Sequence, residues 1–328
     1  RVSAVKRVLP HIAEDREFIE MFIDEAKIAA QLQHPNIGQV YHLGQSDGKY
    51  FIAMEFISGQ DLRIIFDRAR SNQLQLDIGL CVYLVSEICE ALDYAHRKTN
   101  ARQEPMHLVH RDISPQNLVL GYDGSVKLID FGIAKAEGKI NQTQSGILKG
   151  KFSYMSPEQA HGHKIDARSD LFALAIVLYE LLTLERCFLG QSDFSTIERI
   201  RQVEFIPPRK IRRDIPIALE RILQKGLNKD VHQRYQSAAD FQEALKRFVK
   251  NHQINMGKEY AQRFICQLFR SETQREQNRL QEFRQYAQQN IPLAQRAGGY
   301  QQQGKFKQNE ILTGSYPKVK PRFALADK

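Results

Sequence analysis

Three short polar motifs, in a fixed order along the chain, constrain this sequence more than any other feature. An HRD tripeptide at 110–112 is followed by Asn117, a DFG tripeptide at 130–132 follows a short apolar run, and an SPE tripeptide stands at 156–158. In one tight loop, Asp112 could accept a proton while Asn117 binds a cation, and a carboxylate at a strand end is a second hard-cation ligand. The first motif alone could be an accidental match in a polar loop. The three together, in this order and spacing, indicate one built site.

The secondary-structure pattern separates strands from helices. An amphipathic helix is expected over 14–32. The pattern becomes helical after Gly59, and it is helical again from Asp166 up to about residue 250. Residues 171–184 are apolar on almost every face, which predicts a buried helix. Short strands are expected at 2–9, 37–43, 50–56, 118–120 and 126–129. This order predicts an α+β fold with a small lobe that contains strands and a larger helical lobe.

The C-terminal part differs in composition from the rest. One further amphipathic helix is expected from Tyr260 to Tyr286 within an extension at 251–287, and a flexible Gln- and Lys-rich tail at 288–328. Residues 251–328 contain 13 Lys or Arg against 6 Asp or Glu, so they carry seven of the nine net positive charges. Because no aromatic platform is interleaved with these charges, we expect no nucleic-acid partner.

Cysteine usage and hydropathy bear on the compartment. The four cysteines lie in apolar stretches without metal-ligand spacing, which is typical of reduced thiols in a cytosolic protein. No apolar run reaches the ~18 residues needed to cross a bilayer. We therefore expect a cytoplasmic location and no membrane segment in this chain.

The runs around these motifs resemble the bacterial branch of the eukaryotic-type Ser/Thr protein kinase family. They read VHRDISPQNLVL, VKLIDFGIAK, GKFSYMSPEQA and DARSDLFALAIVLYELLT. The resemblance covers roughly residues 1–250. It implies a two-lobe protein-kinase fold, with part of the N-lobe at 1–57 and the C-lobe at 58–250. It also implies ATP and Mg²⁺ as cofactors, a protein substrate, and transfer of the γ-phosphate to Ser or Thr hydroxyls.

Catalytic and metal roles follow from the resemblance position by position. Asp112 would take the proton of the acceptor hydroxyl, and Lys6 would hold the α- and β-phosphates. Asn117 and Asp130 would bind Mg²⁺.

The resemblance also assigns the nucleotide's other contacts. Ala4 and Val119 would enclose the adenine ring, and Met54 would be the gatekeeper. Glu55 to Ile57 would form the hinge, whose backbone bonds adenine, and Asp61 would lie near the ribose. Without the family, plain core packing explains the apolar ones equally well. The assigned residues are Ala4, Met54, Glu55, Ile57, Asp61 and Val119.

Glu25 can be argued from the residues alone. It lies in phase with Phe18, Phe22 and Ala29 on the apolar stripe of the expected helix. A carboxylate on a buried face is costly without a cation. Lys6, on the adjacent strand, is the expected partner, and the alternative is a half-exposed glutamate at the edge of the stripe.

The start of the chain departs from the family pattern. Residue 1 falls within or just before the strand of Lys6, so we expect an incomplete N-lobe without the glycine-rich phosphate loop. A fragment, a truncated gene and a genuine pseudokinase are three explanations. The presence of every downstream catalytic residue favours the first two.

A second departure concerns Ser114 and Lys151. Ser/Thr kinases usually have Lys where this chain has Ser114, and Thr where it has Lys151. Our hypothesis is that Lys151 supplies the cation near the γ-phosphate and Ser114 the hydroxyl. The alternative is that Lys151 is a solvated loop charge. The same exchange removes the usual marker of Ser/Thr over Tyr preference.

Supporting roles are implied for several further residues. Asp170, in an apolar helix, would brace the catalytic loop, and Glu158 would pair with Arg234. Arg111 would pair with a phosphate that orders the loop before the SPE motif. Autophosphorylation of that loop could fall on Thr143 or Ser145.

Three alternative functions remain open. One is a catalytically silent pseudokinase or scaffold, and the missing phosphate loop is its only support. A small-molecule phosphotransferase shares the Asp and Asn loop, but the SPE segment argues for a protein substrate. A nucleic-acid binder would rest on the basic tail alone.

Overall fold

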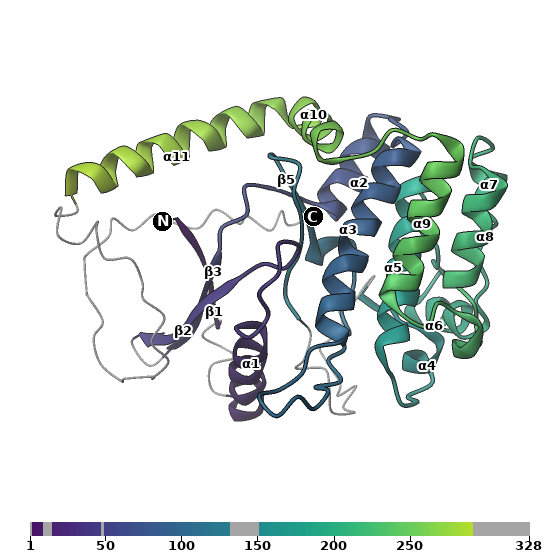
Figure 1. The fold of residues 1–328 in the computed structure, drawn as a ribbon, viewed down its shortest axis with the longest axis horizontal. Helices are drawn as coiled ribbons and strands as arrows, with labels where there is room; N and C mark the ends of the chain where they lie inside the picture. The colour runs from purple at the N-terminus through teal and green to yellow at the C-terminus, as the bar shows by residue number, and fades with distance from the viewer. Residues whose placement is uncertain (1, 9–14, 47–48, 132–150, 291–328) are drawn as a thin grey trace. The chain divides into compact units, whose positions relative to one another are not determined.

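The computed structural model describes residues 2–8, 15–46, 49–131 and 151–290, without the side chains of Lys151 and of residues 287–290. The chain forms two compact units, Arg1–Gln277 and Asn278–Lys328. The first unit contains the sheets and most of the helices drawn in Figure 1. Across the described part of the chain, none of the helices is both long and apolar enough to cross a membrane.

A small antiparallel sheet and one helix form the first part of this unit. The strands β1 (Ser3–Arg7), β2 (Val40–Ser46) and β3 (Lys49–Glu55) are arranged in the order β1-β3-β2. Helix α1 (Arg16–Ala29) begins where Asp15 accepts a hydrogen bond from the backbone of Phe18. Its buried face packs with Val8 and Ile52 into a small separate core.

A second antiparallel sheet begins after the short segment 56–58. It consists of β4 (Gly59–Asp61), β5 (Leu118–Gly121) and β6 (Val126–Leu128). The expectation that the pattern becomes helical directly after Gly59 was wrong, because β4 intervenes before α2 (Leu62–Ser71). A three-residue strand is too short to show alternation. A Cβ at Gly59 would lie only 2.3 Å from the Leu120 carbonyl oxygen, so glycine permits this close pairing.

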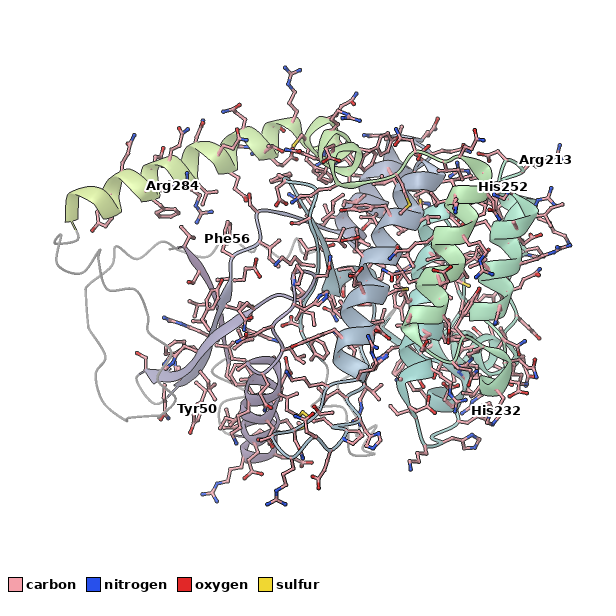
Figure 2. All side chains as sticks on the ribbon, in the orientation of Figure 1. Tyr50, Phe56, Arg213, His232, His252 and Arg284 are labelled. Carbon is pink, nitrogen blue, oxygen red and sulfur yellow. The ribbon has the colours of Figure 1, made fainter. Side chains whose placement is uncertain are left out.

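The larger part of the unit is helical, and α5 (Ala167–Thr183) lies at its centre. The residues of α5 from Ser169 to Thr183 are all buried, which confirms the expected buried helix. It packs against α3 (Ile78–His96) and α9 (Ala238–His252), while charged side chains such as Arg213 point outward (Figures 1 and 2). The other helices are η1 (Pro115–Asn117), η3 (Lys151–Tyr154), α4 (Pro157–Ala160), α6 (Asp193–Gln202), α7 (Pro208–Ile211), α8 (Ile217–Gly226) and η4 (Val231–Gln233).

The C-terminal extension contains two helices and not the single one expected. Helix α10 (Lys258–Leu268) ends at Phe269, whose φ of −121° and ψ of 42° are not helical, and α11 (Arg270–Asn290) follows. Phe269 is only 1% exposed, and the guanidinium of Arg68 lies 4.6 Å from its ring centroid. The break coincides with this buried aromatic ring, and helical periodicity alone does not predict it.

Candidate active site

Lys6 lies between two carboxylates from distant parts of the chain. Its Nζ is 3.3 Å from Oε1 of Glu25 on α1 and 2.9 Å from Oδ1 of Asp130, which follows β6. The stripe of α1 that buries Phe22 and Ala26 carries Glu25 toward the sheet, and β1 places Lys6 opposite Ile52 of β3. Three elements therefore bring a cation and two anions to one point.

Burial and charge act against each other at this point. Burial alone would lower the pKa of Lys6, but the nearby Asp130 and Glu25 carboxylates raise it overall, so the amine stays protonated. Burial raises the pKa of Glu25, and the attraction of Lys6 offsets this only in part. Glu25 is consequently fully ionised, and the ion pair complete, only at a higher pH than an ordinary glutamate needs for ionisation.

A pH prediction follows for Glu25. As the pH falls through its raised pKa, Glu25 becomes neutral and Lys6 loses one of its two partners. We expect kcat/KM of the reaction that this site catalyses to fall on the acid side at a pH above the ordinary glutamate value of ~4.3. A Glu25→Gln variant should be slower and should lack this ionisation in its pH–rate profile. An acid limb unchanged in the variant would assign it to another group.

The catalytic loop is held by the helical core. The Asn117 side chain donates a hydrogen bond to the Asp112 carbonyl at 2.7 Å, closing the loop on itself. Asp170 of α5 accepts hydrogen bonds from the backbone N–H groups of His110 and Arg111, each at 2.8 Å. The expected bracing of the loop by Asp170 is thereby confirmed.

Two residues of the site have left-handed backbone conformations. Arg111 has a φ of 68° and Asp130 a φ of 54°. Such conformations cost non-glycine residues about 1–3 kcal/mol each and persist only where surrounding contacts enforce them. The bonds from Asp170 do so at Arg111. At Asp130 the enforcing contact is the Lys6 ion pair, together with the Ile129 carbonyl bonded to the ring of His110 at 3.2 Å.

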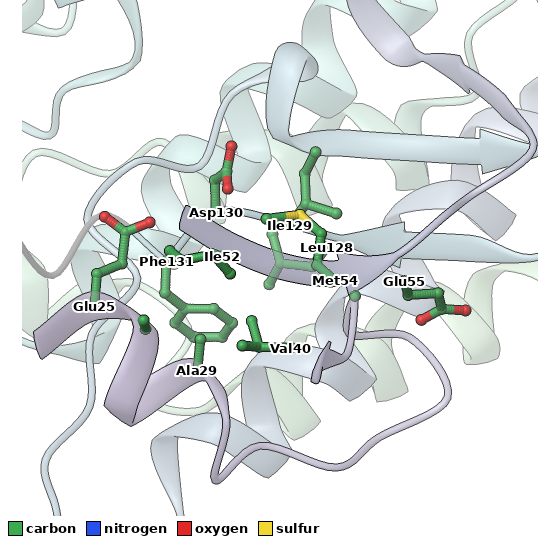
Figure 3. A pocket seen from close by; sticks show the side chains of 12 residues that line it. Glu25, Ala29, Val40, Ile52, Met54, Glu55, Leu128, Ile129, Asp130 and Phe131 are labelled. Atoms are coloured by element: carbon green, nitrogen blue, oxygen red, sulfur yellow. The ribbon is translucent and has the colours of Figure 1, made fainter. Parts of the chain in front are cut away.

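A small cavity lies behind these charges. It has a volume of about 30 Å³, and Figure 3 shows Glu25, Met54, Asp130 and Phe131 around it. The other lining residues are Ala26, Ala29, Gly38, Val40, Ile52, Glu55, Leu128 and Ile129. Met54, the predicted gatekeeper, is one of the residues that line this cavity.

The other predicted nucleotide contacts lie outside this cavity but on neighbouring strands. Ala4 is opposite Met54 in the β1–β3 pair, and Asp61 is opposite Val119 in the β4–β5 pair. Ile57 lies in the segment between β3 and β4. The structure therefore places the predicted adenine and ribose residues on two sheets that the hinge segment connects.

Glu55 makes contacts that the sequence did not suggest. Its backbone N–H donates to the Gln39 carbonyl at 2.8 Å, and its carboxylate pairs with Lys127 of β6 at 2.8 Å. Any bond from the Glu55 backbone to a base is therefore limited to its carbonyl oxygen. The ion pair connects the first sheet to the second directly beside the hinge.

The segment after the SPE motif is anchored in the core. Arg234 is fully buried and donates two hydrogen bonds to the Glu158 carboxylate, both at 2.8 Å. This confirms the expected pair. The pKa of Glu158 is lowered, because bonds from Arg234 and Ser169 outweigh the opposing effect of burial.

Residues 1–249 match the family described as protein kinase domain. The chain belongs to the protein kinase family. Neither this match nor the relatives below support the alternative of a catalytically silent scaffold.

The kinase domain has both curated and structural relatives. Tyrosine-protein kinase MasK of Myxococcus xanthus is 42% identical over 257 residues, which are 78% of this chain and 40% of MasK. Serine/threonine-protein kinase PrkC of Bacillus subtilis is 35% identical over 246 residues, 75% of this chain and 36% of PrkC. The crystal structure of the Mycobacterium tuberculosis PknI kinase domain matches with a TM-score of 0.56 and 28% identity, over 75% of this chain and 84% of that chain. The chain thus spans 36–40% of the length of these two curated relatives.

Sequence reasoning missed three residues of this kinase domain site. His96, the last residue of α3, places Nε2 2.8 Å from Asp170, which it shares with the catalytic loop. Lys127 pairs with the carboxylate of Glu55. Gln39 accepts a hydrogen bond from the backbone N–H of Glu55 and donates one to the Glu55 carboxylate. The one available signal was position, since Lys127 lies between two buried strand residues. The Lys151 side chain and both hydroxyl residues, Thr143 and Ser145, lie outside the described part of the chain.

Proposed function

We propose that this kinase domain transfers the γ-phosphoryl group of Mg·ATP to serine or threonine hydroxyls of protein substrates. One observation carries the proposal: Lys6 Nζ lies within 3.3 Å of Glu25 and 2.9 Å of Asp130. A lysine held in this way offers its positive charge to phosphate oxygens beside a carboxylate that can bind a metal.

The residues present fit the Mg²⁺ that the family implies. Asp130 and the amide oxygen of Asn117 are hard oxygen ligands, and Mg²⁺ typically takes one or two protein ligands and completes its shell with phosphates and water. Bound there, Mg²⁺ would neutralise phosphate charge.

The chain's own groups then account for the transfer. Asp112 would accept the proton of the acceptor hydroxyl while the hydroxyl oxygen forms a bond to the γ-phosphorus. The bond between the γ-phosphorus and the bridging β-phosphate oxygen would break, and ADP would leave. Lys6 would hold the α- and β-phosphates. Ala4, Met54, Glu55, Ile57, Asp61 and Val119 would contact the adenosine, with 1–57 as N-lobe and 58–250 as C-lobe. An ATP-dependent enzyme of this kind is proposed to act in the cytoplasm.

The acceptor hydroxyl is tested by comparing two substrates. PrkC is named a serine/threonine-protein kinase and MasK a tyrosine-protein kinase, so each gives a different expectation. Phosphate incorporation from Mg·ATP should be measured for this chain and for one extended upstream, followed by phospho-amino-acid analysis. We expect phosphoserine and phosphothreonine. If only phosphotyrosine is found, tyrosine is the acceptor and the proposal of serine or threonine is wrong. If neither of the two chains transfers phosphate or binds ATP, the proposed function is contradicted.

Two further roles belong to the proposal. Lys151 would supply a cation near the γ-phosphate, and an unchanged transfer rate in Lys151→Ala would remove that role. Arg111 has two buried guanidinium nitrogens, Nε and Nη1, without a partner among the described residues. A phosphate on Thr143 or Ser145 would provide partners for them. Mass spectrometry that finds no phosphate between residues 136 and 153 of active protein would count against autophosphorylation there.

A further inference from the structure

The segment from Lys258 to Gln277 lies outside the matched kinase domain, yet it belongs to the same compact unit. Ala261 and Ile265 of α10 are fully buried, and Phe269 is nearly so. All three belong to the hydrophobic core that also contains α3 and α5. The extension therefore packs into the kinase core from Ala261 to Phe269, and Thr273 is the last buried residue of the segment.

The extension contacts the element that follows Asp61. Arg68 of α2 donates to Oε1 of Glu272 at 2.8 Å and stacks its guanidinium over the ring of Phe269. Its second terminal nitrogen, Nη1, lies 3.4 Å from the Leu268 carbonyl. One arginine thereby connects α2 to both extension helices, because Leu268 ends α10 and Glu272 lies in α11.

It also contacts the element that precedes Asp61. Gln60 of β4 donates to the hydroxyl of Tyr122 at 2.6 Å, and the backbone N–H of Tyr122 donates to the Ser58 carbonyl at 2.8 Å. The Cys266 thiol of α10 in turn donates to the carbonyl of Tyr122 at 3.3 Å. Thr273 forms a hydrogen bond with the side chain of Tyr122. Tyr122 thus contacts both the extension and the segment that contains β4.

Close backbone approach shows that this packing is tight. Gly124, in the turn between β5 and β6, has a φ of 80°, and a Cβ there would lie 2.2 Å from the Lys258 carbonyl oxygen. The Arg68 hydrogen bond, together with one from Ser271, lowers the pKa of Glu272 to about 2. Since a lowered acid pKa favours the charged form, this contact persists as the pH falls below the ordinary glutamate value and is lost only near pH 2.

We propose that residues 258–277 position the nucleotide: they hold β4 and α2 on either side of Asp61, and Arg68 and Glu272 are the positioning residues. Asp61 is the N-cap of α2, and its carboxylate accepts the Ile64 N–H at 2.9 Å. Movement of α2 or β4 displaces this carboxylate. The inference rests on the proposed function, because the contact of Asp61 with the ribose is part of that proposal.

The test compares arginines on one helix. Arg68→Ala removes the link to the extension, whereas Arg70→Ala removes a comparable but exposed pair with Glu185 and serves as the matched control. We expect Arg68→Ala to weaken binding of Mg·ADP and to raise KM for ATP by roughly threefold to tenfold, with kcat changed less than twofold. Arg68→Lys should recover only part of the affinity, because one ammonium can pair with Glu272 but cannot also reproduce the bond to Leu268 and the stacking on Phe269. Arg70→Ala should match the wild type.

A second measurement needs no nucleotide. Amide hydrogen exchange at Ile64, whose N–H bonds Asp61, should be faster in Arg68→Ala than in Arg70→Ala. If Arg68→Ala does not fold, Glu272→Gln breaks the same pair at its other end. Loss of thermal stability with wild-type affinity for Mg·ADP, or equal exchange at Ile64 in both variants, would overturn the inference. Absence of Mg·ADP binding in the wild type would instead contradict the proposed function, and the exchange result would then decide whether the extension holds Asp61.

Discussion

Asp112→Asn should lower kcat for phosphoryl transfer by about 10²–10⁴-fold, the usual contribution of a general base. The substitution preserves shape but removes the proton acceptor. Because Asn117 and His110 bond the backbone of residue 112 and not its side chain, these contacts should survive. Affinity for Mg·ADP should therefore stay near the wild-type value, so that the change falls on kcat.

The measurement is steady-state phosphate incorporation with ADP affinity determined alongside. Asp67→Asn is a suitable control, since Asp67 is an exposed acid whose ion pair with Arg63 lies within α2. Its kcat should equal that of the wild type. A variant at Asp112 that retained more than a tenth of the wild-type kcat would show that this carboxylate is not the proton acceptor.

Arg234→Leu should destabilise the folded chain by about 3–5 kcal/mol, because it leaves the Glu158 carboxylate buried without its cation. The pair has two charged hydrogen bonds, and Arg234 also bonds the Asn228 carbonyl at 2.7 Å. The guanidinium stacks over Phe172 of α5 at 4.7 Å, so the loss extends into the central helix.

Urea unfolding of the variant measures this change. Arg247→Leu removes an ion pair of the same type on α9, but there the side chains are 69% and 63% exposed. An exposed pair contributes about 0–1 kcal/mol, so this control should unfold close to the wild type. Equal midpoints for the two variants would mean that Arg234 has no structural role beyond that of a surface charge.

Much of the fold and the centre of the site could be predicted from sequence. Amphipathic phase alone placed Glu25 on the inner face of α1, and motif order located Asp112, Asn117 and Asp130. These signals are local, or they repeat at the period of a helix or strand. The expected α+β fold, with a small lobe that contains strands and a larger helical lobe, was confirmed for the same reason.

What sequence reasoning missed depends on contacts between distant positions. His96 is an ordinary helix-end residue until α5 brings Asp170 to it, and Lys127 is an ordinary strand residue until the hinge brings Glu55 to it. The stacking of Arg68 on Phe269, at the break between α10 and α11, likewise joins positions some 200 apart in the chain. No window of neighbouring residues contains such information.

The bonds from Asp170 to the catalytic loop have a consequence for damaged or incompletely folded chains. The left-handed conformation of Arg111 depends on an acid that is buried in the last part of the molecule expected to open. A chain whose helices have formed but whose interior remains loose cannot maintain that loop. Such a chain should lack activity and not merely act on other substrates, so measurable activity itself indicates that the core is packed.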